Sequence, residues 1–252
     1  MPRSGRLLGM TGTSGTSTPD EAALLRFLRV IASPDQIEVA RILALTPVLA
    51  AATVRGGATR EDPSTYWFEE IRHYVYAGDT GLHVAAAAHR PAAALSLIAS
   101  GAEVRARNRR GAEPIHYAAD GNAEEANSDP AAHRAVIEHL ISEGADPNSR
   151  DKSGVAPLHR AVRRRSTTAV RALLDNGADV TLGNKQGSTP LHLAVQNTGA
   201  SNSGSPEAKR NQREIIVLLL HRGARATDTD AKGKTVAAAA TSDWFSELLD
   251  AT

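Results

Sequence analysis

Apolar residues recur along the chain with the roughly 3.6-residue period of an α-helix. The first such stretch follows Asp20 and places four side chains on one face, namely Leu24, Leu25, Leu28 and Ile31. A second stretch has its own apolar side, formed by Ile37, Ala40 and Leu43. Pro47 suits the first position of a short third helix, because the fixed φ of proline is already helical. The N-terminal part of the chain is therefore predicted to be helical.

Farther along, one pattern of apolar residues and glycines repeats. Four segments align, GDTGLHVAA, GAEPIHYAA, GVAPLHRAV and GSTPLHLAV, and they begin at Gly78, Gly111, Gly154 and Gly187. A fifth and degenerate segment, GKTVAAAAT, begins at Gly233. A second motif follows each of the first four as SGAEV, EGADP, NGADV and RGARA, with glycines at Gly101, Gly144, Gly177 and Gly223.

The spacings of the two motifs agree. The motif histidines, His83, His116, His159 and His192, are separated by 33, 43 and 33 residues. The Gly-Ala pairs of the second motif move in step, with separations of 43, 33 and 46 residues. Two motifs with one underlying period and the same extra lengths exclude coincidence and indicate a repeat protein.

Each repeat carries the signals of a helix pair. Thr189 is a good N-cap, and Pro190 is suited to the first helical position that follows it. Leu191 is expected in the core, and Ala194 lets the next helix approach. The second helix supplies four apolar residues, Ile215, Ile216, Leu218 and Leu219. Gly223 ends it, because a helix terminus commonly requires a positive φ there.

A period of 33 with the pattern TPLHxA resembles the ankyrin-repeat family, from about residue 74 to the C-terminus. The resemblance implies an all-α ankyrin-repeat solenoid of about five repeats over residues 71–252, each with a helix-turn-helix and a β-turn finger. Residues 19–70 are then an N-terminal helical cap or degenerate repeats, and Trp244, Phe245 and Leu248 are expected to cap the other end. Residues 1–18 are rich in Gly, Ser and Thr and are predicted to be a disordered tail.

Two insertions, near residues 120–132 and 197–209, interrupt the period between the first and second helix of a repeat. Each ends in a helix-start signal, Asp129-Pro130 in one and Ser205-Pro206 in the other. We therefore expect the second helix of both repeats to begin about one turn early. The rest of each insertion is predicted to be exposed loop.

Composition excludes several kinds of site. The chain has no cysteine, which rules out disulfides, thiolate nucleophiles and Cys-ligated metals. Its formal net charge is +1, so no overall field attracts nucleic acid or a membrane. No apolar run is long enough to span a bilayer. The sequence contains no P-loop, GxSxG or HExxH pattern. We expect a cytoplasmic, non-catalytic protein without a cofactor.

The four motif histidines invite a zinc hypothesis, which geometry opposes. Equivalent positions of stacked helices lie about 8–10 Å apart, whereas zinc needs each ligand within about 2 Å. The family resemblance instead implies that each histidine forms hydrogen bonds within and between turns.

Candidate binding residues lie at two places. The residues just before the motif glycines would form the tips of successive fingers, and they are Tyr76, Arg109, Arg110, Lys152, Lys185 and Lys232. Stacking would align four cationic tips into a ridge, although lysine is also ordinary at a solvated tip. The exposed end of the first helix contributes Arg163 and Arg164 in one repeat and Gln196 and Asn197 in another.

Five aromatic residues fall within residues 66–76, namely Tyr66, Trp67, Phe68, Tyr74 and Tyr76. They either seal the end of the solenoid core or form a binding hot spot, since Trp and Tyr dominate such spots. The leading function is a protein-binding scaffold that uses the fingers and the concave face of the first helices, with a partner whose surface is acidic. The alternative is a nucleic-acid or polyanion binder, which the balanced charge makes unlikely.

One ion pair is also predicted. Asp120 follows His116 by four residues, and Arg163 follows His159 by four. Equivalent positions on neighbouring helices lie side by side, so the two opposite charges are expected to pair at the exposed end of the stack. An exposed pair of this kind would contribute only about 0–1 kcal/mol.

Overall fold

The computed structural model describes residues 20–34, 36–121, 129–196, 204–240 and 245. The tail predicted for residues 1–18 lies outside this part of the chain. The first elements are α1 (Glu21–Ala32), α2 (Gln36–Leu45), the 3-10 helix η1 (Pro47–Ala51), β1 (Trp67–Phe68), the 3-10 helix η2 (Glu69–Ile71) and β2 (His73–Tyr74). The remaining helices are α3 (Gly81–Ala87), α4 (Pro91–Ala99), α5 (Pro114–Ala118), α6 (Pro130–Ser142), α7 (Pro157–Arg163), α8 (Thr167–Asp175), α9 (Pro190–Ala194), α10 (Pro206–His221) and α11 (Val236–Ala239).

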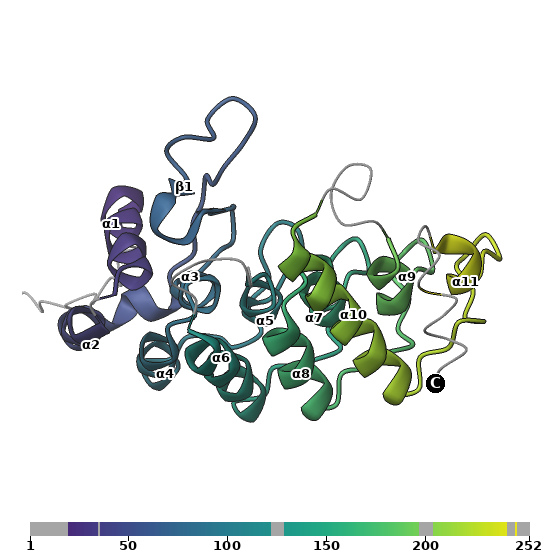
Figure 1. Ribbon diagram of the computed structural model, residues 1–252. Coiled ribbons are helices and arrows are strands. Elements are labelled where there is room, and N and C mark those ends of the chain that lie inside the picture. Colours follow the sequence, from purple (N-terminus) through teal and green to yellow (C-terminus); the bar gives the residue numbers. More distant parts are fainter. Residues whose placement is uncertain (1–19, 35, 122–128, 197–203, 241–244, 246–252) are drawn as a thin grey trace, which may run out of the picture.

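The helices form two layers that run along one elongated stack (Figure 1). In the first layer, α1, α3, α5, α7, α9 and α11 each contact the next helix in the series. In the second layer, α2, α4, α6, α8 and α10 do the same. The molecule is therefore an all-α solenoid, in which each helix pair packs mainly on its neighbours.

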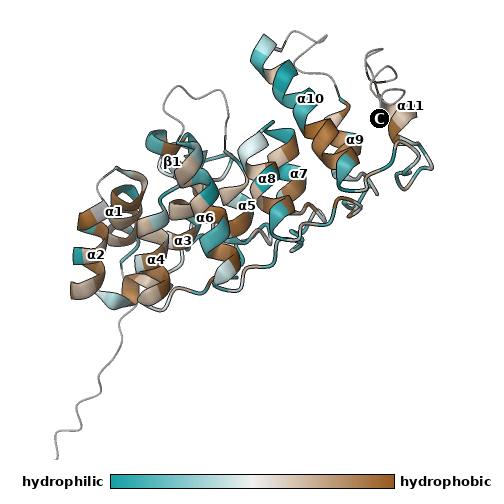
Figure 2. Ribbon diagram, turned by 60° about the horizontal axis from the view of Figure 1, so that its bottom comes forward, coloured by the Kyte–Doolittle hydropathy of each residue, from teal (hydrophilic) through white to brown (hydrophobic). Residues whose placement is uncertain are grey.

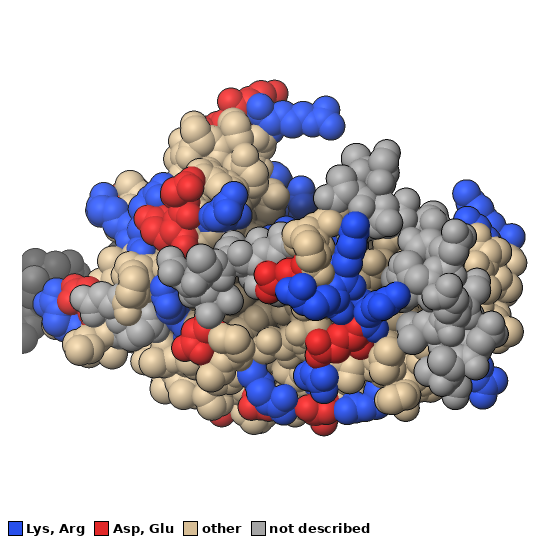
Figure 3. Space-filling model, in the orientation of Figure 1, with Lys and Arg blue, Asp and Glu red and all other residues tan. Residues whose placement is uncertain are grey.

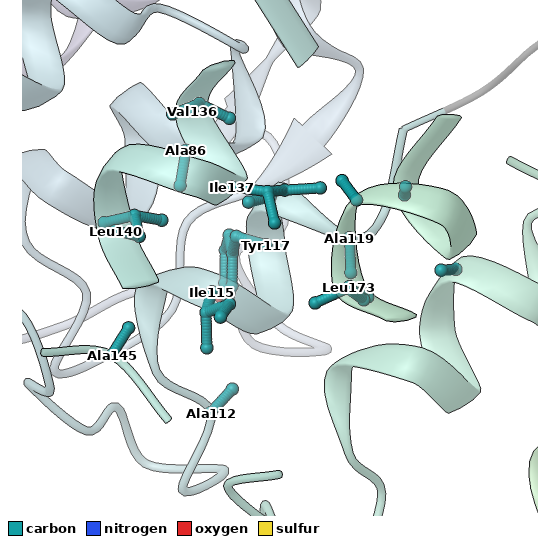
Figure 4. Close-up of a cluster of buried hydrophobic side chains, with 14 of the residues drawn as sticks. Ala86, Ala112, Ile115, Tyr117, Ala119, Val136, Ile137, Leu140, Ala145 and Leu173 are labelled. Atoms are coloured by element: carbon teal, nitrogen blue, oxygen red, sulfur yellow. The ribbon is translucent and has the colours of Figure 1, made fainter. Parts of the chain in front are cut away.

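Leucine, isoleucine, valine and alanine fill the space between the layers. Ile115 of α5, Ile137 and Leu140 of α6, and Leu173 of α8 are all fully buried in one cluster (Figure 4). Small side chains such as Ala119 lie among them and allow the helices to approach closely. The polar residues concentrate on the outer faces and on the turns between pairs (Figure 2). This distribution explains why the apolar period of the sequence is helical.

The ends of the helices follow the local sequence. Thr189 is the N-cap of α9, Pro190 occupies its first turn, and Leu191 is fully buried, as predicted. Gly223 follows α10 with a φ of 98°, which confirms its predicted role as a helix terminator. At Gly187 the φ is 73°, and an added Cβ would lie 2.3 Å from the backbone nitrogen of Ala231. Only glycine therefore fits where one turn lies against the next.

The predicted apolar face of α2 is wrong for Ile37 and Ala40 and confirmed for Leu43. Val39 and Leu43 are buried, whereas Ile37 is 84% exposed and Ala40 is also exposed. Helix α2 belongs to the second layer and contacts α1, α4 and η1. Val39 and Leu43 are four residues apart and share one narrow stripe toward these neighbours, which Ile37 and Ala40 do not reach.

The two insertions lengthen the helices that follow them. Helix α6 has 13 residues and α10 has 16, whereas α4 and α8 have 9 each. The side chain of Asp129 accepts hydrogen bonds from the backbone at the start of α6, and Ser205 does so at the start of α10. The predicted early starts are confirmed, by about one turn in α6 and about two turns in α10. Residues 122–128 and 197–203 of the insertions lie outside the described residues.

The motif histidines join each helix pair to the next turn. In His83, Nδ1 accepts a hydrogen bond from the backbone N–H of Thr80 at 3.2 Å, and Nε2 donates to the carbonyl of Ala112 at 3.1 Å. Nε2 donates in the same way in the other three repeats. His116 donates to the carbonyl of Val155 at 3.1 Å, His159 to that of Ser188 at 3.0 Å, and His192 to that of Lys234 at 3.2 Å. Because Nδ1 accepts and Nε2 donates, each ring is a neutral tautomer.

Burial favours the neutral form of three of these rings. It lowers the pKa of His83 and of His159, and it lowers the pKa of His116 to about 4. An unfolded chain binds protons on these three histidines below a pH of about 6.5, whereas the folded chain binds them only at a lower pH. The unfolded state therefore gains protons first as the pH falls, and folding stability decreases over that interval.

We expect the free energy of unfolding to decline as the pH is lowered from about 6.5 toward about 4, with each buried histidine contributing up to about 1.4 kcal/mol per pH unit. Urea unfolding followed by circular dichroism across this range measures the slope. A His116→Asn variant keeps an acceptor and a donor but removes one titrating group, so its slope should be shallower. An unchanged slope in this variant would contradict the assignment.

Candidate partner-binding surface

The turns between helix pairs, which we call the turn fingers, are tied together by their backbones. The N–H of Arg109 donates to the carbonyl of Ala77 at 2.8 Å, and that of Lys152 to Arg110 at 2.9 Å. The ladder continues from Lys185 to Ser153 at 3.1 Å and from Ala231 to Gln186 at 2.9 Å. Every finger tip is thus fixed against its predecessor, and side chains on adjacent tips hold a constant spacing.

The cationic tips fall into two groups. Lys152, Lys185 and Lys232 are exposed on successive fingers. Arg109 and Arg110 instead turn toward Tyr76, with guanidinium carbons 5.2 and 4.1 Å from the ring centroid. Arg109 also donates to the carbonyl of Ala58. Cation–π contacts attract a guanidinium to an aromatic ring, so these two arginines are held against the first finger while they remain exposed, and the three lysines project without such a contact.

The ends of the first-layer helices present the other predicted residues. Arg163 and Arg164 are exposed after α7, and Gln196 is exposed after α9. Arg163 and Gln196 line a small hollow of about 200 Å³ between these helices. Asn197 lies outside the described residues. The structure therefore brings part of each predicted set to the surface, with the fingers at one end of the helix pairs and these residues at the other.

The partner predicted for Asp120 is wrong. Its carboxylate pairs with Arg160 at 2.6 Å, and Arg160 also lies 3.4 Å from Asp151. Arg160 is three residues before Arg163, so it lies one turn closer to the core, and its side chain crosses from α7 to the end of α5. Only 11% of the Arg160 side chain and 15% of the Asp120 side chain are exposed.

This burial changes the expected energetics of the pair. Burial alone would raise the pKa of Asp120, but hydrogen bonds and charges from His73 and Arg160 outweigh it and hold the pKa at about 2. Arg164 also donates from Nε to the backbone carbonyl of Asp120 at 3.0 Å. Asp120 is therefore an internal joint between helices α5 and α7, and not an exposed surface charge.

The aromatic segment forms a hairpin that packs on the first layer. Phe68 is fully buried, whereas Tyr74 is 38% exposed. Trp67 and Tyr74 are opposite each other in the strand pair, and their ring centroids are 4.7 Å apart. Phe68 thus fits the hypothesis that the segment seals the core, while the Trp67 and Tyr74 pair remains at the surface.

Sequence reasoning missed a hollow of about 670 Å³ that the hairpin forms with the helix ends farthest from the fingers. Arg72 and His73 of the hairpin, His89 and Arg90 after α3, and Arg164 after α7 contribute to its wall. The sequence carried no signal for this hollow beyond the position of His89, six residues after its motif histidine. In the structure His89 has a φ of 51°, where the chain leaves α3.

Two buried carboxylates nearby are fully occupied by structural contacts. Asp79 accepts hydrogen bonds from the Tyr117 hydroxyl at 3.0 Å and from Asn108 at 2.8 Å. Glu113 accepts from Arg107 at 2.9 Å and from Arg105 at 3.4 Å. Burial and Asp79 raise the pKa of Tyr117 well above its usual value. These groups stabilise the finger between α4 and α5 and leave no free acid or base there.

Among the described residues, no three His, Asp or Glu side chains are placed to hold a metal ion. Across the same residues, no helix combines the length and apolar character that a membrane span requires.

Comparison with known families identifies the repeats. A family model described as ankyrin repeats (3 copies) matches residues 130–230, which correspond to the stack from α6 to the finger after α10. Residues 130–230 are ankyrin repeats, and the fold is an all-α ankyrin solenoid. No curated protein matches the chain. Ankyrin repeats are generally protein–protein interaction modules and are typically non-catalytic.

We expect Arg160→Met to lower the free energy of unfolding by about 3 kcal/mol, because it leaves the carboxylate of Asp120 buried without its partner. Adding Asp120→Asn should recover a large part of that loss. Urea unfolding of the wild type, both single variants and the double variant gives the coupling energy. The exposed pair Arg171–Glu214 is the matched control and should couple by less than about 1 kcal/mol. Additive losses at Asp120 and Arg160 would contradict the joint.

Proposed function

We propose that this ankyrin-repeat solenoid is a non-catalytic scaffold that binds another protein through its turn fingers and the concave face of its first-layer helices. The observation that carries the proposal is the set of three exposed lysines, Lys152, Lys185 and Lys232, on fingers whose backbones are hydrogen-bonded in series. A partner with an acidic strip fits this surface.

The rigidity of the fingers supports binding. A flexible loop loses conformational freedom when it is ordered against a partner, and that loss weakens the complex. Here the backbone ladder and the histidine bonds fix each tip in advance. Only the lysine side chains still lose conformational freedom when a partner binds, so the entropic cost of ordering this surface is small.

The distribution of charge favours a protein over a nucleic acid. Figure 3 shows Lys and Arg side chains interspersed with Asp and Glu on the face it displays. The net charge of the whole chain is +1. A protein that tracks a phosphate backbone typically carries a large excess of basic residues on one face. A partner that itself mixes charges and has a local acidic strip is better suited.

The test reverses the finger lysines together in the variant Lys152→Glu, Lys185→Glu, Lys232→Glu. Proteins retained by the wild type in a pull-down from native lysate are identified, and their affinities are then measured with purified components. Reversed charge replaces attraction by repulsion, so affinity should fall at least about tenfold and lose its salt dependence.

The matched control changes the charge equally on exposed residues away from the fingers, as Arg60→Glu, Lys209→Glu, Arg210→Glu. It should retain the partner with nearly wild-type affinity. Equal losses in both triple variants would mean that net charge alone governs binding, and an intact affinity in the finger variant would overturn the proposal.

A further inference from the structure

A second surface feature lies at the other end of the helix pairs from the fingers. The hollow of about 670 Å³ is walled by the β1–β2 hairpin, by the ends of α3 and α5, and by the starts of α6 and α8. Its volume falls within the range of ligand sites in proteins, about 300–1,000 Å³. The fold alone does not require a space of this size, since most protein interiors are close-packed.

Acidic side chains in the wall already have partners within the fold. Glu69 accepts a hydrogen bond from the indole N–H of Trp67 at 2.6 Å. Glu70 lies 3.8 Å from the guanidinium of Arg29. Both groups belong to the hairpin; the contact of Glu69 lies within it, and that of Glu70 holds it against α1.

The other two acids in the wall are equally engaged. The side chain of Asp129 accepts hydrogen bonds from the backbone N–H groups of Ala131 and Ala132, at the start of α6. Asp120 is the buried partner of Arg160 described above. None of the four carboxylates therefore depends on an arginine of the wall itself for its charge balance.

The arginines of the wall are in the opposite situation. Arg72, Arg90 and Arg164 have no carboxylate within ion-pair distance in the part of the chain that the structure describes. Arg164 uses only its Nε, for the backbone of Asp120, which leaves its terminal nitrogens available. The Nε of Arg90 is buried without a hydrogen-bond acceptor, and so is the Nε2 of the adjacent His89. Buried polar atoms are almost always satisfied, so these two atoms call for a further partner.

Three helices also begin at the hollow. Arg90 is the N-cap of α4, Pro130 is the first residue of α6, and Ser166 is the N-cap of α8, and all three residues line the wall. These helices have 9, 13 and 9 residues. A helix start carries partial positive charge and unpaired N–H groups, so the three starts add to the field of the arginines.

Backbone strain is concentrated at the same place. Among the described residues, the non-glycine positions with a positive φ are Arg72, His89 and Arg165, at 46°, 51° and 55°. Arg72 and His89 line the hollow, and Arg165 lies between two residues that do. His89 and Arg165 occupy the same repeat position, six residues after the motif histidine, where a left-handed residue ends the first helix.

We propose that this hollow binds an acidic side chain, a Glu or an Asp within a peptide segment of the partner protein, between Arg90 and Arg164 with Arg72 at the rim. The inference rests on the proposed function, because it assumes a protein partner, but it concerns a different surface from the fingers. Arginine holds a carboxylate through two parallel hydrogen bonds, which gives orientation as well as attraction.

A singly charged carboxylate suits the wall better than a phosphate. The described part of the wall includes four carboxylates, and carboxylates repel a doubly charged group more strongly than a singly charged one. The three arginines and the helix starts attract a single negative charge. The choice between the two anions is therefore part of the test.

The experiment uses the full chain and two fluorescein-labelled peptides, Gly-Glu-Glu-Gly-Glu-Glu-Gly and its Gln counterpart, with binding measured by fluorescence anisotropy. The wild type should bind the Glu peptide at least about tenfold more tightly than the Gln peptide. In the double variant Arg90→Gln, Arg164→Gln the preference should disappear, because both guanidinium groups are lost while a long polar side chain is kept at each position.

The matched control removes the same charge from exposed residues of α10, as Lys209→Gln, Arg210→Gln, and should keep the preference within about twofold. Thermal unfolding checks that both double variants fold. If Arg90→Gln, Arg164→Gln were unfolded, Arg72→Gln at the exposed rim would replace it and should weaken the Glu peptide alone.

Three results would overturn the inference: no preference for Glu in the wild type, equal losses in the α10 control, or tighter binding of a peptide with phosphoserine at the Glu positions. The finger triple variant separates this proposal from the previous one. Loss of partner binding there with the Glu preference intact supports both proposals. If the finger triple variant still binds the partner, the proposal for the finger surface is rejected. The peptide result then decides whether the proposal for the hollow stands.

Discussion

Neutral imidazole rings hold the successive turns of this molecule together. Each motif histidine accepts one hydrogen bond at the start of its own helix and donates another to the following finger. A protonated ring has no acceptor, so the bond at Nδ1 would be lost and two N–H groups would face each other. Protonation at one histidine thus weakens both a helix start and the contact between neighbouring pairs. The finger ladder, and with it the spacing of the exposed lysines, depends on that neutral state.

Much of this architecture could be predicted from the sequence because it is periodic. The motif spacing predicted the helix pairs, the turns and the place of the insertions, and the Asp129 and Ser205 signals predicted where α6 and α10 begin. These features depend on nearest neighbours in the chain or on identical steps between repeats. The seal at the far end remains a prediction, although Phe245 is buried as expected.

The features that sequence could not predict depend on the reach of long side chains between repeats. Helix periodicity placed Asp120 beside the helix that carries Arg163, but it could not say that Arg160 crosses the joint instead. It also could not show that Arg109 and Arg110, although exposed, lie against the ring of Tyr76. From the sequence, every arginine can be taken as a charge available to a partner. In the structure, several arginines form ion pairs or hydrogen bonds within the fold.

The hollow illustrates why internal use of charge matters for function. A left-handed residue other than glycine costs about 1–2 kcal/mol, and an unsatisfied buried polar atom costs about 1–3 kcal/mol. His89 carries both, with a φ of 51° and a buried Nε2 that lacks a well-aligned acceptor, although the ring also interacts with the backbone carbonyl of Ala118. Its ring stacks on His133 at 3.8 Å, which returns only about 0.5–1.5 kcal/mol. Burial lowers the pKa of His89 to about 3, so the ring stays neutral and no charge attraction offsets the difference. These costs exceed the contribution of the ring stacking, and a bound carboxylate that accepts a hydrogen bond from Nε2 would offset part of them.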